Sequence, residues 1–156
     1  MPPFERVVTE HGAVVLRVCR ALLNPTDAQD AWSETFLAAM EAYPALRPDS
    51  NVRGWLVTIA HRKAIDLHRR AARTALPMGE LPERPAPAHP ESDPALWAAV
   101  AALPEKQRLA VVHHHLAGLP YAEIAALTGS TPAATRRAAA DGIAALRRLH
   151  STGALS

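Results

Sequence analysis

The chain has 156 residues, of which 49% are hydrophobic but only 4% aromatic, and its formal net charge is +2 at pH 7. This length suits one ordinary domain or two small ones, and apolar content made mostly of Ala, Leu and Val favours packed helices over a sheet. So mild a net charge excludes neither protein nor nucleic-acid partners, because the placement of the charges matters more than their sum.

The start of the chain, MPPFERVVTEHG, lacks the basic stretch and apolar core of a signal peptide. No window approaches the ~20 apolar residues of a membrane span. We therefore expect a soluble, cytoplasmic protein without membrane insertion. The single cysteine, Cys19, excludes an intrachain disulfide and lies in an apolar helical run, so it is expected to be a small buried side chain rather than a reactive thiol.

The second predicted helix, about 27–42, carries an acidic stripe. A first helix is expected over about 3–23; Asn24-Pro25-Thr26 ends it, and Thr26 or Asp27 is expected to cap the second. Asp27, Asp30 and Glu34 gather on one side of this second helix, apart from an apolar side. In a protein with a basic net charge, such a stripe indicates a basic partner.

A basic helix is expected after the loop 43–51 (YPALRPDSN). Ser50 or Asn51 is expected to cap it, and it continues to about Arg73. Its only acid is Asp66, and His61 and His68 could add positive charge. The pattern suits contact with phosphates, although a solvated helix face would show it too. The basic residues are Arg53, Arg62, Lys63, Arg69, Arg70 and Arg73.

Residues 74–94 (TALPMGELPERPAPAHPESDP) predict a flexible linker. Six prolines fall there, which remove helix donors, together with four acids that resist burial. The linker divides the chain into an N-terminal domain, 1–73, and a C-terminal domain, 95–156. The expected fold class is therefore all-α, with two small helical domains.

The C-terminal domain is expected to contain a helix-turn-helix. Helices are predicted over about 94–102, 104–117, 121–128 and 132–149, with Thr131 as the cap of the last one and Pro132 as its first residue. A tight turn, Gly129-Ser130, joins the last two helices, as in a helix-turn-helix whose second helix enters the major groove. Arg136 and Arg137 then lie where bases or phosphates are contacted. An ordinary helical hairpin remains the alternative.

The sequence predicts no catalytic site, metal site or cofactor. His113, His114 and His115 are consecutive, so on a helix they point about 100° apart and cannot face one ion. There is no nucleophile elbow, and no glycine-rich loop for a phosphate. We therefore expect a protein that is not an enzyme.

Three segments in order resemble a bacterial RNA polymerase sigma factor of the extracytoplasmic-function (ECF) type. DAQDAWSETFLAAM is similar to that family's polymerase-binding helix, and NVRGWLVTIAHRKAIDLHRR to its promoter −10 helix. LPEKQRLAVVHHHLAGLPYAEIAALTGSTPAATRRAAADGIAALRRL is similar to its −35-binding domain. The resemblance covers almost the whole chain and implies regions 2 and 4 of a sigma factor on either side of the linker.

The resemblance implies roles for particular residues. Contact with core RNA polymerase falls to Asp27, Asp30, Glu34 and Met40, whereas Trp32, Phe36 and Leu37 pack within the domain or join the contact. Contact with the −10 element, including capture of a flipped base by the loop 43–51, falls to Asp49, Ser50, Asn51, Arg53, His61, Arg62, Lys63, Arg69 and Arg70. Contact with the −35 element falls to Thr131, Thr135, Arg136 and Arg137.

Some positions depart from the family's pattern. Ser33 and His61 replace a usual Gln and Arg, and Thr135, Ala140 and Asp141 stand where basic residues are common. Gly142 in mid-helix costs ~1 kcal/mol relative to Ala. The departures from Thr135 to Gly142 predict weakened −35 binding or an unusual reading of that element, whereas Ser33 predicts the weakening of one hydrogen bond in the polymerase contact.

The resemblance implies a factor that binds core RNA polymerase, recognises −10 and −35 promoter elements, helps open the duplex and directs initiation at a restricted promoter set. An anti-sigma factor is a further expected partner. Two alternatives remain: an autonomous helix-turn-helix regulator that binds duplex DNA without polymerase, and a sigma-like interaction protein with weakened −35 reading.

Overall fold

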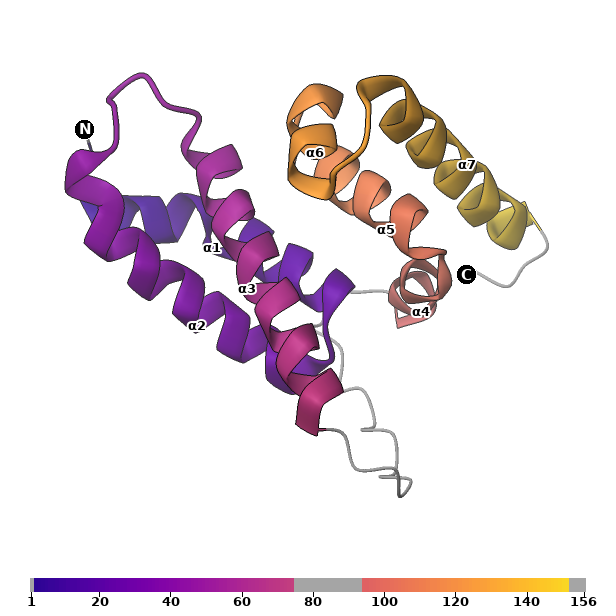
Figure 1. Ribbon diagram of the computed structural model, residues 1–156, viewed down its shortest axis with the longest axis horizontal. Coiled ribbons are helices and arrows are strands. Elements are labelled where there is room, and N and C mark those ends of the chain that lie inside the picture. The colour runs from indigo at the N-terminus through magenta and orange to yellow at the C-terminus, as the bar shows by residue number, and fades with distance from the viewer. Residues whose placement is uncertain (1, 75–93, 152–156) are drawn as a thin grey trace. The chain divides into compact units, whose positions relative to one another are not determined.

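The structure, a computed structural model, describes residues 2–74 and 94–151, and within these ranges the chain forms helices and no strand (Figure 1). The predicted all-α class is confirmed. In the first range lie α1 (Phe4–Leu22), α2 (Pro25–Ala42), a 3₁₀ turn (Tyr43–Ala45) and α3 (Val52–Thr74). In the second lie α4 (Pro94–Ala102), α5 (Glu105–Val111), a π-helical turn (Val112–Leu116), α6 (Tyr121–Thr128) and α7 (Pro132–Ser151).

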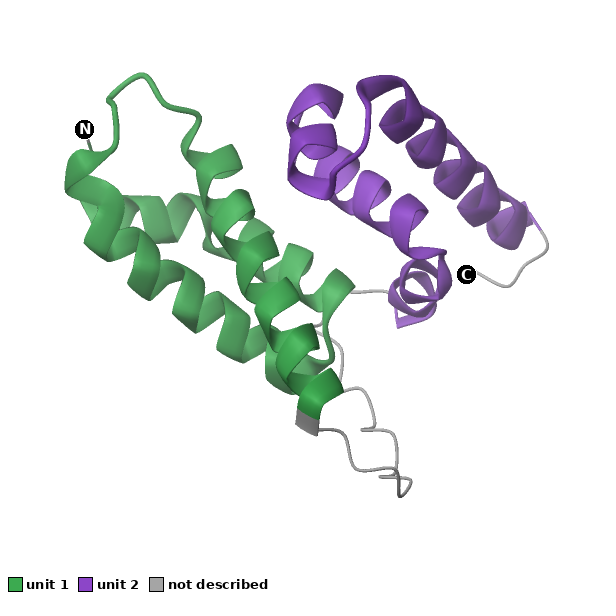
Figure 2. Cartoon of the chain, in the orientation of Figure 1, with its two compact units in different colours: residues 1–86 green, residues 87–156 purple. Residues whose placement is uncertain are grey.

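The chain divides into two compact units, Met1–Ala86 and Pro87–Ser156 (Figure 2). Most of the predicted linker, residues 75–93, lies outside the described residues. Among the helices that are described, none combines the length and the apolar character needed to cross a membrane.

Unit 1 (Met1–Ala86) is a three-helix packing of α1, α2 and α3. Its core is built around Val15, Phe36 and Leu56 together with buried alanines, and the aromatic side chains of Phe4, Trp32, Tyr43 and Trp55 pack against it. The Trp32 indole Nε1–H donates to the Gly12 carbonyl at 2.9 Å, which ties α2 to α1. Because alanines fill much of the seam between these helices, their backbones can approach closely, and the other faces of α2 and α3 stay available for partners.

The start of α2 differs from the prediction. Asn24, and not Thr26 or Asp27, is the N-cap, and Pro25 is the first helical residue. The Asn24 Oδ1 accepts from the Asp27 N–H at 2.8 Å, and the Asn24 Nδ2 donates to the Asp27 carboxylate at 3.0 Å. Proline suits the first helical position because its missing N–H would have no partner there. Asp27 is thus held at the helix start by its own cap.

Unit 2 (Pro87–Ser156) is organised around the packing of α5 against α7, with α6 against α7 completing the helix-turn-helix. Gly129 ends α6 with a φ of 73°, in the left-handed region that glycine adopts without a steric penalty. The Ser130 N–H donates back to the Ala125 carbonyl at 2.9 Å, which closes the turn. Thr131 caps α7 as predicted, since its Oγ1 accepts from the Ala134 N–H at 3.1 Å.

Candidate binding surfaces

The exposed face of α2 combines carboxylates with large apolar side chains. Asp30 is exposed, and Leu37 and Met40 have 59% and 52% of their surface accessible, the two highest values among the exposed large hydrophobic residues of the described chain. Glu34 is half-buried and its carboxylate lies 3.8 Å from the Arg70 guanidinium of α3. The prediction left open whether Leu37 packs inside, and the structure places it outside.

Glu41 belongs to the same face, although the sequence reasoning missed it. It follows Asp30 by eleven residues, which at 100° per residue brings it within about 20° of Asp30 around the helix axis. Its side chain is exposed. The signal was present in the helical periodicity, but Glu41 lies near the end of the predicted helix and outside the motif that carried the resemblance. Asp30, Leu37, Met40 and Glu41, with Glu34 at the edge, are called the α2 face below.

The basic residues of α3 lie on one side of the helix, with one exception. Arg62, Arg69, Arg70 and Arg73 are exposed and Lys63 is half-buried. Arg53 precedes Arg62 by nine residues, which places it about half a circle from Arg62 and about 80° or more from the other basic side chains around the helix axis. The structure therefore brings these five together and separates Arg53 from them. They are called the α3 basic face: Arg62, Lys63, Arg69, Arg70 and Arg73.

Arg53 lies beside α1 instead. The pKa of His11 is lowered by burial of its imidazole and also by the nearby Arg53 charge, while Glu10 opposes the shift. His68, a second residue with potential charge, faces α1 as well, because its Nε2 lies 3.1 Å from the Leu22 carbonyl oxygen. Neither side chain adds to the α3 basic face.

The loop before α3 is built by turns and a cap. The Ser50 N–H donates to the Arg47 carbonyl at 3.1 Å, and the Asn51 Oδ1 accepts from the Gly54 N–H at 3.2 Å. Asn51 is therefore the cap of α3, one of the two predicted residues. Asp49 is exposed and Ser50 half-buried, so the loop offers polar groups at the surface beside the helix start.

Two predicted DNA-contacting residues are buried. His61 is 3% exposed and lies on the inner side of α3, and Thr135 is 4% exposed and donates its Oγ1–H to the Thr131 carbonyl at 2.8 Å. A side chain without accessible surface cannot meet a base or a phosphate in this conformation. In this conformation neither side chain therefore has the accessible surface that the predicted DNA contact requires.

The start of α7 presents two arginines among small side chains. Arg136 and Arg137 are exposed, as are Ala133 and Ala134 one turn earlier. The Arg136 guanidinium carbon lies 5.4 Å from the centroid of the Tyr121 ring. The helix thus offers charged groups for phosphates or guanines, and methyl groups of a size that contacts thymine methyls.

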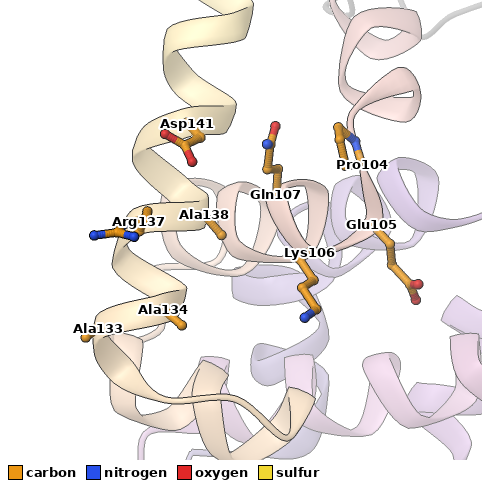
Figure 3. Close-up of a pocket in the computed structure, with 9 residues that line it drawn as sticks. All are labelled: Pro104, Glu105, Lys106, Gln107, Ala133, Ala134, Arg137, Ala138 and Asp141. Atoms are coloured by element: carbon orange, nitrogen blue, oxygen red, sulfur yellow. The ribbon is translucent and has the colours of Figure 1, made fainter.

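A groove of about 660 Å³ runs between α5 and the start of α7 (Figure 3). Glu105, Lys106, Arg137 and Asp141 line it, but Figure 3 shows Arg137 and Glu105 pointing in different directions rather than at a common centre. In the described parts of the chain, no group of three His, Cys, Asp or Glu side chains could hold a metal ion. The charged side chains that line this surface groove beside α7 therefore do not converge as catalytic groups would.

Comparisons with known proteins identify both units. The sigma-70 region 2 family model matches residues 7–74, and the sigma-70 region 4 family model matches residues 94–146. The ECF RNA polymerase sigma factor ShbA of Streptomyces griseus is 35% identical over 155 residues, covering 87% of this chain and 81% of that relative. RNA polymerase sigma factor CarQ of Myxococcus xanthus is 29% identical over 160 residues, covering 94% and 88%.

Solved structures show the same fold. The sigma factor RpoE from Bartonella quintana, solved in complex with the anti-sigma factor NepR, matches with a TM-score of 0.75 at 18% identity, covering 95% of this chain and 96% of that one. CnrH, solved in complex with the cytosolic domain of CnrY, matches with a TM-score of 0.66 at 26% identity, covering 96% and 88%. The chain belongs to the sigma-70 family as an ECF sigma factor, a protein that directs promoter-specific transcription together with core RNA polymerase.

Proposed function

We propose that the α2 face docks on core RNA polymerase. It combines exposed carboxylates with two exposed apolar side chains, Leu37 and Met40, and this mixture is typical of a protein interface rather than of a solvated helix. Asp30 and Glu34 supply the charge that steers a basic partner, and Leu37 and Met40 supply the apolar area. Asp27 contributes less than the sequence predicts, because its carboxylate accepts from the Asn24 cap.

The α3 basic face and the loop before it form the proposed −10 surface. Arg62, Lys63, Arg69 and Arg70 meet the phosphates, while Asp49, Ser50 and Asn51 lie beside a flipped base. Arg53 takes no part in this set because it lies on the other side of α3.

Arg136 and Arg137, on the α7 helix capped by Thr131, form the proposed −35 surface. In a helix-turn-helix the first residues of the second helix reach the major groove, and both arginines are exposed there. Only these two basic side chains occupy the exposed start of α7, so we propose that −35 contact supplies a modest share of promoter affinity. In this proposal the domain 1–73 contacts polymerase and the −10 element, the domain 95–156 contacts the −35 element, and residues 74–94 are the linker.

The protein acts by binding and has no enzymatic activity of its own. A protein inhibitor is a further proposed partner, since RpoE and CnrH were each solved with a protein partner. An inhibitor that covers the α2 face would compete directly with polymerase. We place this protein in the cytoplasm, where polymerase and promoter DNA are found.

The test of polymerase docking is charge reversal on the α2 face. The Asp30→Arg, Glu34→Arg variant is expected to bind core RNA polymerase more than about tenfold more weakly than wild type, because like charges then meet across the interface. The matched control is Glu5→Arg, Glu10→Arg, which makes the same change of charge at exposed positions of α1 and is expected to bind normally. Binding is measured by pull-down of core RNA polymerase on the immobilised protein and by titration of one partner with the other.

Two outcomes would contradict the proposal. Equal binding by wild type and the α2 variant would remove the α2 face from the interface. If wild type fails to bind polymerase but shifts duplex DNA alone, the protein works as an autonomous helix-turn-helix regulator instead.

A further inference from the structure

Three side chains from three successive elements meet beside the start of α7. The rings of His114 and Tyr121 stack with centroids 4.0 Å apart and an angle of 16° between their planes. The Arg136 guanidinium carbon lies 5.4 Å from the Tyr121 ring centroid, within the range of a cation–π contact. A residue of the π-helical turn, the first residue of α6 and a residue of the first turns of α7 thus form one cluster.

The backbone fixes the first two members of this cluster. The last turn before α6 widens, so that the Ala117 N–H donates to the Val112 carbonyl five residues earlier at 3.1 Å. π-helical turns are rare and often occur at functional sites. The His114 Nδ1 lies 2.9 Å from the Leu119 carbonyl oxygen, so Nδ1–H donates there and orients the ring face toward Tyr121.

The third member, Arg136, has a fixed backbone and a long side chain. Thr131 holds the first turn of α7, because its hydroxyl accepts from the Ala134 N–H and its carbonyl accepts from the Thr135 N–H at 2.9 Å. Arg136 is exposed, so its guanidinium would sample many rotamers without a neighbour to limit them. The half-buried Tyr121 ring is such a neighbour.

We infer that Tyr121, backed by His114, is a positioning residue that holds the Arg136 guanidinium in place for contact with the −35 element. The inference rests on the −35 role proposed above for the start of α7. A side chain that is ordered before binding loses less conformational freedom when it meets DNA, which strengthens the contact. If instead the Tyr121 hydroxyl itself contacted DNA, removal of the hydroxyl in Tyr121→Phe would weaken binding, whereas the inference predicts that Tyr121→Phe binds like wild type.

The test uses holoenzyme assembled from the full chain and core polymerase. Wild-type holoenzyme first selects duplexes from a promoter library randomised over the −35 region, and an enriched duplex becomes the probe for affinity measurements. The variants are Tyr121→Leu, Tyr121→Phe, Arg136→Ala and the double variant Tyr121→Leu, Arg136→Ala. Thermal unfolding of each variant, monitored by circular dichroism, verifies that unit 2 is folded.

Tyr121→Leu is expected to weaken probe binding about two- to fivefold, the size of an exposed cation–π contact. Tyr121→Leu should cause no further loss of affinity in the Arg136→Ala background. If Arg136 contacts a base, Tyr121→Leu and Arg136→Ala should relax the base preference at the same position of the probe; if it contacts a phosphate, both should reduce the salt dependence of binding equally. Tyr121→Phe, which keeps the ring, should bind like wild type. His114→Ala should cause a smaller loss that also disappears in the Arg136→Ala background.

Four results would overturn the inference. Losses from Tyr121→Leu and Arg136→Ala that multiply would show that the two residues act independently. A loss in Tyr121→Phe as large as in Tyr121→Leu would assign the role to the hydroxyl. If wild-type holoenzyme forms but selects no −35 sequence, the proposed −35 function fails and the inference falls with it. This result differs from wild-type probe binding by Tyr121→Leu, which would overturn the inference and leave the −35 function in place.

Discussion

Gly142 has a packing reason to be glycine. A Cβ at this position would lie 2.6 Å from the Val111 Cγ2 and 3.4 Å from the Gln107 carbonyl oxygen, so α7 and α5 approach more closely here than a side chain would allow. From the sequence, Gly142 indicated only a locally weakened helix, because intrinsic propensity is visible in one segment and interhelical packing is not. The glycine therefore supports the seating of α7 on α5.

Gly142→Ala is expected to lower the free energy of unfolding by about 1 kcal/mol, since roughly 2 kcal/mol of overpacking outweighs a gain of about 1 kcal/mol in helix propensity. Val111 is buried and β-branched, so it cannot turn aside cheaply. Denaturant unfolding of the chain measures the change. In the Val111→Ala background the same substitution should cost less, and equal or greater stability of the single variant would show that Val111 can move.

His61 and Thr135 show where single-residue reasoning fails. Each directly precedes an exposed arginine, Arg62 or Arg136, and the resemblance implies DNA contact for both because they stand at contact positions of the family. Consecutive residues on a helix point about 100° apart, so the neighbour of an exposed side chain can face the core. The composition of a basic segment predicts that it contacts DNA, but only the packing of the other helices decides which of its residues face inward.

At the scale of helices the sequence was sufficient for most boundaries. Gly129 and Pro132 end and begin elements where predicted, because these residues restrict the backbone independently of tertiary contacts. The cap of α2 was misplaced by two or three residues. Thr26 and Asp27 are good capping residues in isolation, but Pro25 favours the first helical position, and Asn24 before it is extended, with φ −64° and ψ 164°.

Asn24→Ala is expected to destabilise unit 1 by about 1 kcal/mol, because the Asp27 N–H loses its acceptor and the Asp27 carboxylate loses a donor. Thr26→Ala, at the position that sequence alone made a candidate cap, is the matched control and should change stability little. Thermal unfolding of both variants gives the comparison. If Thr26→Ala were the more damaging substitution, the capping arrangement at the start of α2 would have to be revised.

For the whole molecule, three motifs in order predicted the family correctly, although each alone was weaker. The sigma-70 region 2 and region 4 models match residues 7–74 and 94–146, ranges that fall within or close to the predicted domains. The −35 half was predicted with more departures from the family pattern than the polymerase-binding half. The structure accounts for Gly142 through packing and for Thr135 through burial, whereas nothing in it explains Asp141 within α7, the helix proposed to contact DNA.

Because each unit has its own helices and core, the two proposed activities should separate by mutation. Arg136→Ala, Arg137→Ala is expected to bind core polymerase like wild type but to lose preference for promoters with the selected −35 element. Pull-down and in vitro transcription on paired templates, with and without that element, measure the two activities. Loss of polymerase binding in this variant would show that α7 also serves the polymerase interface.

Cys19 bears on how the protein can be controlled. It is the only cysteine of the chain, it is 1% exposed in the core of unit 1, and burial raises the pKa of its thiol to about 12. Oxidants react with exposed thiolates, and at physiological pH this sulfur is both protonated and shielded. The Cys19 thiol is therefore not available to register an oxidative signal while unit 1 remains folded, and among the described sulfur-containing side chains the exposed Met40 is the one open to direct oxidation.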